Sequence, residues 1–205
     1  MPEEEGIALF RAACSAGAVG GPLLEIGTFC GKSAIYLGAA ARVARTVLFT
    51  IDHHRGSEEH QPGEGYHDER LEDEKGRIDT LPEFRRTIDG AGLWDVVIAV
   101  VGESASVAQR WATPLAMVFV DGGHSHEAAH SDFTSWAPHI APGGLLVIHD
   151  VFPDPDDGGR PPFEIYERAL DSDRFTEINS CGSLRVLRKH APLARAEQRQ
   201  GDTFG

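Results

Sequence analysis

The sequence predicts an α/β fold in which a mostly parallel β-sheet carries helices on both faces. Short apolar segments alternate with amphipathic stretches along most of the chain, which is the pattern of βαβ units. The first five apolar segments are continuous, as in strands that are covered on both faces. The last two alternate between apolar and polar residues, which predicts an antiparallel hairpin at the end of the sheet.

The expected elements follow in order along the chain. A leading helix is expected at Glu3–Ala16, where three glutamates occupy the first turn. The parallel strands are expected at Leu23–Gly27, Val47–Asp52, Val96–Val101, Ala116–Asp121 and Gly144–His149. The helices between them are expected at Lys32–Val43, Leu81–Ala91, Ser106–Trp111 and His126–Trp136. The turn residues Pro142-Gly143-Gly144 are expected to precede the fifth strand.

The segment after Asp150 has a different pattern. Prolines and glycines between Pro153 and Pro162 predict a loop, and a helix is expected at Phe163–Leu170. Two short strands, Phe175–Asn179 and Leu184–Arg188, would then pair around a turn at Ser180–Ser183. We expect one domain over residues 1–189, with a lid-like loop at 53–77 and a polar tail at 190–205.

Composition limits the classes of function. The chain has 205 residues and a formal net charge of −13, which disfavours nucleic acid or an anionic membrane as a partner. Three widely spaced cysteines imply no disulfide framework. No segment approaches the roughly 20 apolar residues that cross a bilayer, and the acidic start is unlike a signal peptide. We therefore expect a cytoplasmic protein.

A glycine-bearing loop, Gly27–Gly31, follows the first strand and precedes a helix. Glycines there allow a tight turn and a close approach to a ligand at the helix N-terminus. A P-loop needs four residues between its first glycine and Gly-Lys-Ser, whereas this loop has three between Gly27 and Gly31. A dinucleotide fingerprint is also a poor fit because Phe29 takes the place of its second glycine. A turn without any ligand remains the alternative.

Asp52 closes the second expected strand, about 25 residues after Gly27. A carboxylate at this position can accept hydrogen bonds from both hydroxyls of a ribose. The alternative is a strand-end residue that faces solvent. Together with the glycine loop, Asp52 favours the ribose function.

The fourth strand ends in Asp121-Gly122-Gly123-His124, where ligands of open parallel sheets collect. The overlapping residues His126 to His130 also match the HExxH pattern of zinc peptidases, with Glu127 as its acid. Phe133 takes the place of the glycine that continues the metzincin pattern. A zinc hydrolase is therefore kept as a remote alternative.

His149 and Asp150 close the fifth strand, beside the expected position of Asp121. Two carboxylates and an imidazole at one sheet edge could bind a divalent cation, and mostly oxygen ligands favour Mg²⁺ or Mn²⁺. The alternative is that both residues only end the strand.

In combination, these residues resemble a class I S-adenosylmethionine-dependent methyltransferase. Glu25–Gly31 is similar to the first motif of that family, Asp52 to its ribose-binding acid, and Gly102–Ser104 to its adenine-proximal loop. The resemblance extends from about Pro22 to Arg188 and implies a Rossmann-like, seven-stranded fold with an antiparallel terminal hairpin. The cofactor-binding residues it implies are Glu25, Gly27, Thr28, Gly31, Ser33, Asp52, His53, Gly102, Glu103, Ser104 and Asp121.

Within that family, the segments Val120–His124 and Pro142–Asp150 are similar to small bacterial O-methyltransferases, including macrocin-type enzymes that methylate sugar hydroxyls. By position, the resemblance to the catechol type implies Asp121, His149 and Asp150 as ligands of Mg²⁺ or another divalent cation. His149 stands where that type has aspartate, and His124 stands in the place of its catalytic lysine.

The resemblance thus implies O-methylation of a small hydroxylated acceptor, a sugar or polysaccharide precursor, with S-adenosylmethionine as cofactor. His124 would remove the acceptor proton, since an imidazole titrates near physiological pH. A homodimer is expected, and no nucleic-acid or membrane partner. An N- or C-methyltransferase, or a binder on the same fold that transfers no methyl group, would share the cofactor residues.

Overall fold

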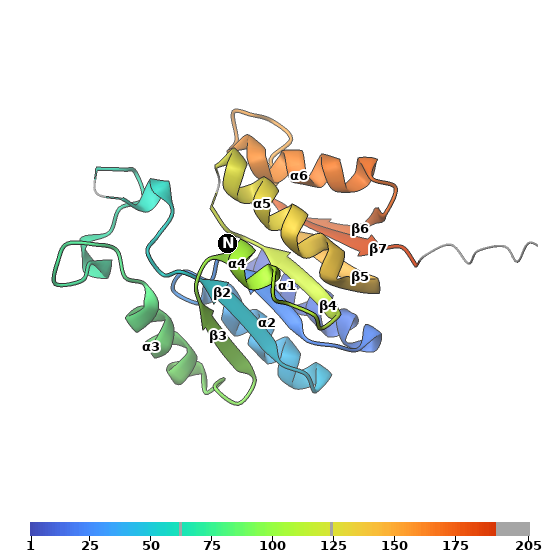
Figure 1. The fold of residues 1–205 in the computed structure, drawn as a ribbon, viewed down its shortest axis with the longest axis horizontal. Helices are drawn as coiled ribbons and strands as arrows, with labels where there is room; N and C mark the ends of the chain where they lie inside the picture. Colours follow the sequence, from blue (N-terminus) through green and yellow to red (C-terminus); the bar gives the residue numbers. More distant parts are fainter. Residues whose placement is uncertain (62, 124, 192–205) are drawn as a thin grey trace, which may run out of the picture.

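The computed structural model describes residues 1–61, 63–123 and 125–191. In this part of the chain seven strands form one sheet in the order β3-β2-β1-β4-β5-β7-β6 (Figure 1). The strands are β1 (Leu23–Ile26), β2 (Leu48–Asp52), β3 (Val97–Val101), β4 (Leu115–Val120), β5 (Ile140–Ile148), β6 (Phe175–Cys181) and β7 (Leu184–Lys189). The predicted α/β class and the terminal hairpin are confirmed.

The centre of the sheet is parallel. Strand β1 pairs in parallel with both β2 and β4, and β5 pairs in parallel with β4. Strand β7 runs antiparallel between β5 and β6. Every residue of β1 and β4 is buried, which explains why β4 is apolar without alternation and β1 is apolar apart from Glu25.

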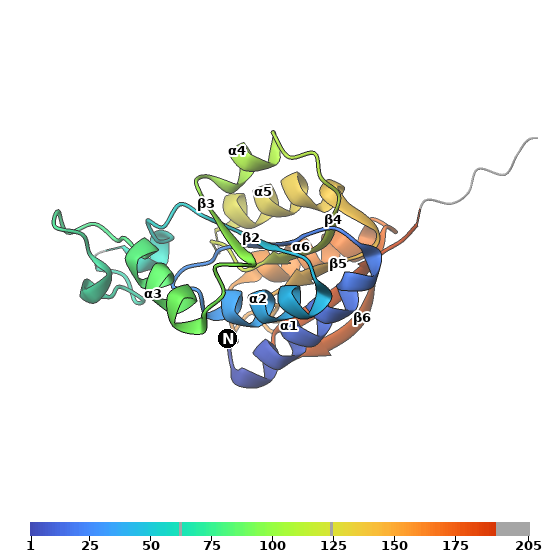
Figure 2. The same cartoon turned by 90° about the horizontal axis from the view of Figure 1, so that it is seen from below.

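Two groups of helices cover the two faces of the sheet (Figure 2). One face carries α1 (Glu3–Ala16), α2 (Lys32–Ala44) and α3 (Leu81–Ala91), and the other carries α4 (Ser104–Ala108), α5 (His126–Trp136) and α6 (Arg160–Asp171). Short 3-10 helices lie at Gly17–Val19, Glu58–His60, Glu69–Leu71 and Ala137–His139. Among the described residues, no helix is long and apolar enough to cross a membrane.

Each face has its own apolar core. On the first face, Leu9 of α1, Leu37 of α2 and Phe84 of α3 pack with Phe119 of β4. On the second face, Phe133 and Trp136 of α5 and Ile165 of α6 pack against the sheet. Because strand residues alternate between the two faces, one continuous apolar strand supplies both cores.

Several predicted boundaries were wrong. Pro142–Gly144 does not precede β5 but lies within it, where the pairing with β4 shifts register between Leu115 and Met117. Helix α6 begins at Arg160 rather than Phe163, because prolines fit the first turn of a helix. Helix α4 spans Ser104–Ala108 instead of Ser106–Trp111, and the hairpin turn is limited to two residues after Cys181. Of the expected tail, residues 192–205 lie outside the described part.

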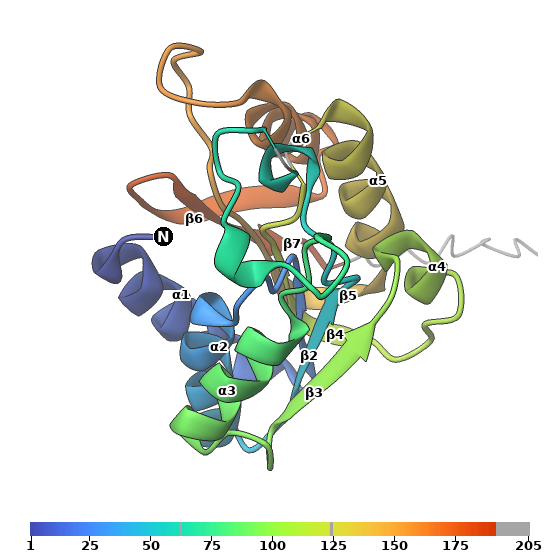
Figure 3. The ribbon, with the colours of Figure 1, turned by 90° about the vertical axis from the view of Figure 1, so that its left-hand side faces the viewer.

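The predicted loop at 53–77 lies beside the carboxyl ends of the central strands (Figure 3). It contains the two 3-10 helices Glu58–His60 and Glu69–Leu71 and one isolated bridge between Glu72 and Ile78. Its two ends are held together, since Nδ1 of buried His54 lies 2.7 Å from Oγ1 of Thr80.

Helix α1 is fixed to the sheet by a buried acid. Glu5 Oε2 lies 2.8 Å from Nε2 of His149, which follows β5, and both side chains are 5% exposed. The other oxygen, Oε1, accepts hydrogen bonds from the backbone N–H of Ser183 at 2.6 Å and from its hydroxyl at 2.9 Å. Burial raises the pKa of Glu5, but the bonds from His149 and Ser183 outweigh burial and lower it. Glu5 is therefore an ionised carboxylate inside the protein.

The hairpin turn leaves room for this carboxylate only because residue 182 is glycine. Gly182 has φ +55°, a left-handed conformation, and a Cβ built on it would overlap Oε1 of Glu5. The turn between β6 and β7 and the first turn of α1 are thus fitted to each other.

Replacing Glu5 by alanine should destabilise the protein by about 1–3 kcal/mol, because Nε2 of His149 and the backbone N–H of Ser183 would be left without a buried acceptor. Glu4→Ala is the matched control, since Glu4 is exposed in the same turn and should change stability by less than about 0.5 kcal/mol. Urea unfolding followed by circular dichroism measures both. Equal losses in the two variants would contradict the buried pair.

Candidate active site

A cavity of about 1120 Å³ opens at the carboxyl ends of the parallel strands. The residues that follow β1, β2, β4 and β5 line it, together with the start of α4 and one side of α5. This edge is where the strand order of an open parallel sheet predicts a ligand. Its volume exceeds the roughly 300–1,000 Å³ of common small-molecule pockets, so two small molecules can share it.

Most of the predicted site residues meet in this cavity. The lining includes Gly27, Thr28, Ser33, Asp52, His53, Gly102, Glu103, Ser104, Asp121, His149 and Asp150. Glu25 and Gly31 do not line it. His124, the predicted catalytic base, lies outside the described residues.

The glycine loop approaches the end of β4 closely. Gly27 has φ +86°, and a Cβ built on it would overlap the carbonyl oxygen of Asp121. No other residue type fits there without moving the backbone. Gly31, with φ +88°, is the N-terminal cap of α2 and packs near Phe84, so it sets the turn into the helix, and its contact with the cofactor stays a prediction.

Glu25 lies beneath the loop and is fully buried. Neither of its carboxylate oxygens has a hydrogen-bond partner among the residues that the structure describes. Burial raises the pKa of Glu25 to about 8, and the nearby hydroxyls of Ser33 and Thr28 offset only part of that increase. Among the described residues no loop amide donates a hydrogen bond to Glu25, so that part of its predicted function was wrong, whereas its contact with the methionine part of the cofactor stays a prediction.

Asp52 is held by two backbone amides at the end of β2. Its Oδ2 accepts a hydrogen bond from Phe29 N at 2.8 Å, and Oδ1 accepts one from His54 N at 2.7 Å. Each carboxylate oxygen can accept a second bond, so the side chain can still bind a ligand hydroxyl. The glycine loop and the predicted ribose acid therefore form one rigid unit.

Three predicted metal ligands meet at the ends of β4 and β5. Nδ1 of His149 lies 2.9 Å from Asp121 Oδ1 and 3.2 Å from Asp150 Oδ1. Asp150 has φ +56°, a strained conformation for a residue with a side chain. Burial lowers the pKa of His149, but the bonds to Asp121 and Asp150 outweigh burial and raise it to about 10.

This arrangement offers ligand atoms for a divalent cation. Asp121, His149 and Asp150 each place one possible ligand atom within 4.8 Å of the others, and all three residues line the cavity. A metal binds an imidazole nitrogen that carries no proton. Both nitrogens of His149 face carboxylates in this structure, Nδ1 toward Asp121 and Asp150 and Nε2 toward Glu5, so His149 would exchange one of these contacts for a metal. The carboxylates of Asp121 and Asp150 need no such exchange, and His149 stays a predicted ligand.

A buried acid on α5 was missed by the sequence analysis. Asp132 lines the cavity, and burial raises its pKa to about 6, although its hydrogen bond with Ser104 opposes the shift. The Ser104 hydroxyl also accepts a 2.8 Å hydrogen bond from Nε1 of Trp136. Ser104 thus fixes the start of α4 to α5. Only the helical spacing of Asp132 and Trp136, one turn apart on α5, could have indicated this contact.

The 53–77 segment supplies one wall of the cavity. Glu58, His60, Glu64 and Tyr66 line this wall. The ring of His60 stacks on Phe29 of the glycine loop, with ring centroids 4.7 Å apart. The 53–77 segment thus contacts the glycine loop at Phe29, whose backbone N–H bonds Asp52. A lid over the cavity needs such a contact.

The HExxH residues lie elsewhere. His126, Glu127 and His130 do not line the cavity, and Glu127 is exposed. Both imidazoles face Glu164 of α6. A hydrolase needs its metal inside a substrate cleft, and this cluster lies outside the cavity at the strand ends.

Solved structures share the fold over nearly the whole chain. The O-methyltransferase NovP aligns with a TM-score of 0.69 and 17% identity, covering 92% of this chain and 80% of that one. The O-methyltransferase TomG from Streptomyces achromogenes, in complex with SAM, aligns with 0.64 and 20%, covering 93% and 82%. An O-methyltransferase from Bacillus cereus, in complex with SAH, aligns with 0.61 and 18%, covering 92% and 82%.

A family model described as a methyltransferase domain matches residues 24–151. This range contains the glycine loop, Asp52, Asp121 and both residues after β5. It covers more than half of the chain. The resemblance drawn from the sequence is thus confirmed, and the chain belongs to the methyltransferase-domain family.

Proposed function

We propose that this protein transfers the methyl group of S-adenosylmethionine to a hydroxyl of a sugar or polysaccharide precursor. The observation that carries the proposal is the single cavity that joins the glycine loop and Asp52 to an acid-rich wall. NovP, TomG and the Bacillus cereus protein are O-methyltransferases with the same fold, which supports oxygen as the methylated atom.

The cofactor would occupy the half of the cavity nearest β1 and β2. Asp52 would accept hydrogen bonds from the ribose hydroxyls, and the adenine would lie beside Glu103 at the start of α4. The backbone amides at the N-terminus of α2 would face the carboxylate of the methionine part. Thr28 and Ser33, which line this half, offer hydroxyls to the same group.

The acceptor would occupy the other half, between Asp121 and the 53–77 segment. Its wall carries Glu58, Glu64, His60 and Tyr66, which accept or donate hydrogen bonds to hydroxyl groups. The same carboxylates repel a phosphorylated acceptor. This chemistry supports a neutral polyol as the acceptor.

The methyl carbon is already activated, so the protein has to align the acceptor oxygen and remove one proton. We assign proton removal to His124 from its place in the sequence after Asp121. A Mg²⁺ ion held by Asp121 and Asp150 would lower the pKa of the acceptor hydroxyl. His149 keeps the two carboxylates in position by bonding both of them.

The test of this proposal measures the transfer of labelled methyl from S-adenosylmethionine to a panel of glycosides, catechols and amines. We expect alkali-stable methyl ethers on glycosides, with turnover lost after chelation and restored by Mg²⁺, because a free alcohol is a poor nucleophile. Asp150→Asn should need more Mg²⁺ for the same rate. Methylation of amines alone would indicate an N-methyltransferase. Full turnover in the metal-stripped protein would contradict the proposed dependence on Mg²⁺.

Asp52→Asn should weaken the binding of S-adenosylhomocysteine at least tenfold, as expected when a hydrogen bond to a charged group is lost. Calorimetry measures the dissociation constant. Asp95→Asn is the matched control, because Asp95 is exposed and precedes the N-terminal end of β3, away from the strand ends that line the cavity. Unchanged affinity in Asp52→Asn would refute the ribose assignment, provided that both variants melt like the parent.

His124→Ala should lower turnover by roughly 10²–10⁴-fold, the range of general base catalysis, and leave S-adenosylhomocysteine affinity unchanged. The exposed His190 provides the control variant His190→Ala, for which we expect the parent rate. Steady-state kinetics at saturating acceptor measure both. A His124→Ala protein that turns over normally would show that another group takes the proton.

A further inference from the structure

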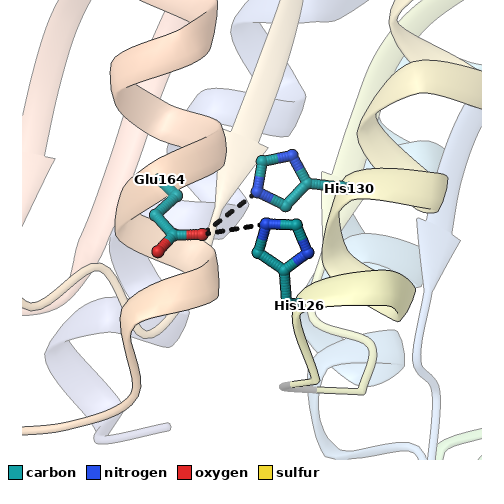
Figure 4. Close-up of side chains that lie close together, drawn as sticks. All are labelled: His126, His130 and Glu164. Atoms are coloured by element: carbon teal, nitrogen blue, oxygen red, sulfur yellow. Dashed lines mark hydrogen bonds and ion pairs between the residues drawn. The ribbon is translucent and has the colours of Figure 1, made fainter.

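Two histidines and a glutamate meet on the outer surface of α5 and α6 (Figure 4). His126 and His130 are one helical turn apart on α5, so their rings share a face and stack with centroids 4.1 Å apart. Glu164 of α6 points at both rings. Its Oε2 lies 3.1 Å from Nε2 of His130 and 3.6 Å from Nε2 of His126.

These separations are those of ligands around one metal ion. Zinc binds imidazole nitrogen and carboxylate oxygen at about 2.0–2.1 Å, which places two ligand atoms of a tetrahedral site about 3.3 Å apart. The two measured distances lie on either side of that value, and all three ligand atoms lie within 4.8 Å of one another. The His126 ring, the more exposed of the two, is the one that lies farther from Glu164.

We propose that His126, His130 and Glu164 form a binding site for one divalent transition-metal ion, with Zn²⁺ as the preferred ion. Two imidazoles and one carboxylate suit zinc, nickel or copper rather than magnesium, which prefers oxygen ligands. The side chains are 73%, 23% and 38% exposed respectively, so an ion reaches the site from solvent and water completes its coordination.

This site is separate from the one at the strand ends. Asp121 and Asp150 supply carboxylates inside the cavity, whereas the helix site lies outside it and contains two imidazoles. The two sites therefore select different ions. The inference does not depend on the proposed methyl transfer.

Bound metal would join the first turns of two neighbouring helices. The opposite side of α5 carries Ala128, Ser131 and Asp132, which line the cavity. Fixing α5 to α6 from outside therefore holds this wall of the cavity in place. The site stabilises the helix pair and takes no part in bond breaking.

Arg168 opposes metal binding in the present arrangement. Its Nη1 lies 3.3 Å from Nδ1 of His130, and a guanidinium can only donate. An imidazole that binds metal through Nε2 carries its proton on Nδ1, so two donors would face each other. Arg168→Gln removes the positive charge and offers a carbonyl oxygen to Nδ1–H, which should tighten zinc binding several-fold.

The experiment titrates Zn²⁺ into the full-length, tag-free and metal-stripped protein by calorimetry. We expect one ion with micromolar or tighter affinity, a higher melting temperature with zinc, and visible absorption typical of four- or five-coordinate Co²⁺ after cobalt substitution. His130→Ala and Glu164→Gln should each weaken zinc binding at least tenfold. Neither residue lines the cavity, so the affinity for S-adenosylhomocysteine should stay at the parent value. An unchanged affinity also shows that the variants are folded.

Two controls place the ion. His190→Ala removes an exposed histidine elsewhere, and Asp150→Asn removes a carboxylate of the strand-end site. Both variants should bind zinc with the affinity of the parent. Parent-like zinc affinity in His130→Ala would overturn the proposal. Loss of zinc binding in Asp150→Asn, with His130→Ala unaffected, would assign the ion to the strand ends and overturn it as well.

Discussion

The buried ion pair between Glu5 and His149 is the interaction on which the arrangement of the site depends. It connects helix α1, the end of β5 and the β6–β7 turn at one point. On its other side, His149 bonds Asp121 and Asp150, both of which line the cavity. A buried charge without its partner is costly. Helix α1, the β6–β7 turn and the ends of β4 and β5 therefore keep their relative positions as long as the pair persists.

Two groups near the cavity reduce its net negative charge. Glu25 is neutral below about pH 8, and the imidazolium of His149 offsets part of the charge of its acidic neighbours. Asp52, Asp121 and Asp150 remain at the surface of the cavity, where they attract a cation. A sulfonium is such a cation. The charge pattern therefore agrees with the proposed cofactor while the interior avoids repulsion between buried carboxylates.

Most of the fold could be predicted from the sequence, because apolar runs such as Leu115–Val120 mark buried strands and the helices between them follow a regular period. The strand-end acids could be placed for the same reason. The function of Glu5 could not, since an acid in a first turn is normally exposed and its partners are 144 and 178 residues away. The contact of His149 Nε2 with Glu5 was therefore not predicted, although His149 itself was placed at the site. Pro142–Gly144 was predicted as a turn, because the register shift that accommodates these residues within β5 cannot be read from the sequence.

The partners of Glu5 also bear on how the protein is made. Helix α1 is synthesised before both of its partners, since His149 and Ser183 follow Glu5 by 144 and 178 residues. Until then the Glu5 carboxylate can only stay hydrated, because burying it alone is unfavourable. The apolar face of α1 therefore cannot close over the completed sheet early in translation. Native docking of helix α1 is therefore a late event in the synthesis of this domain.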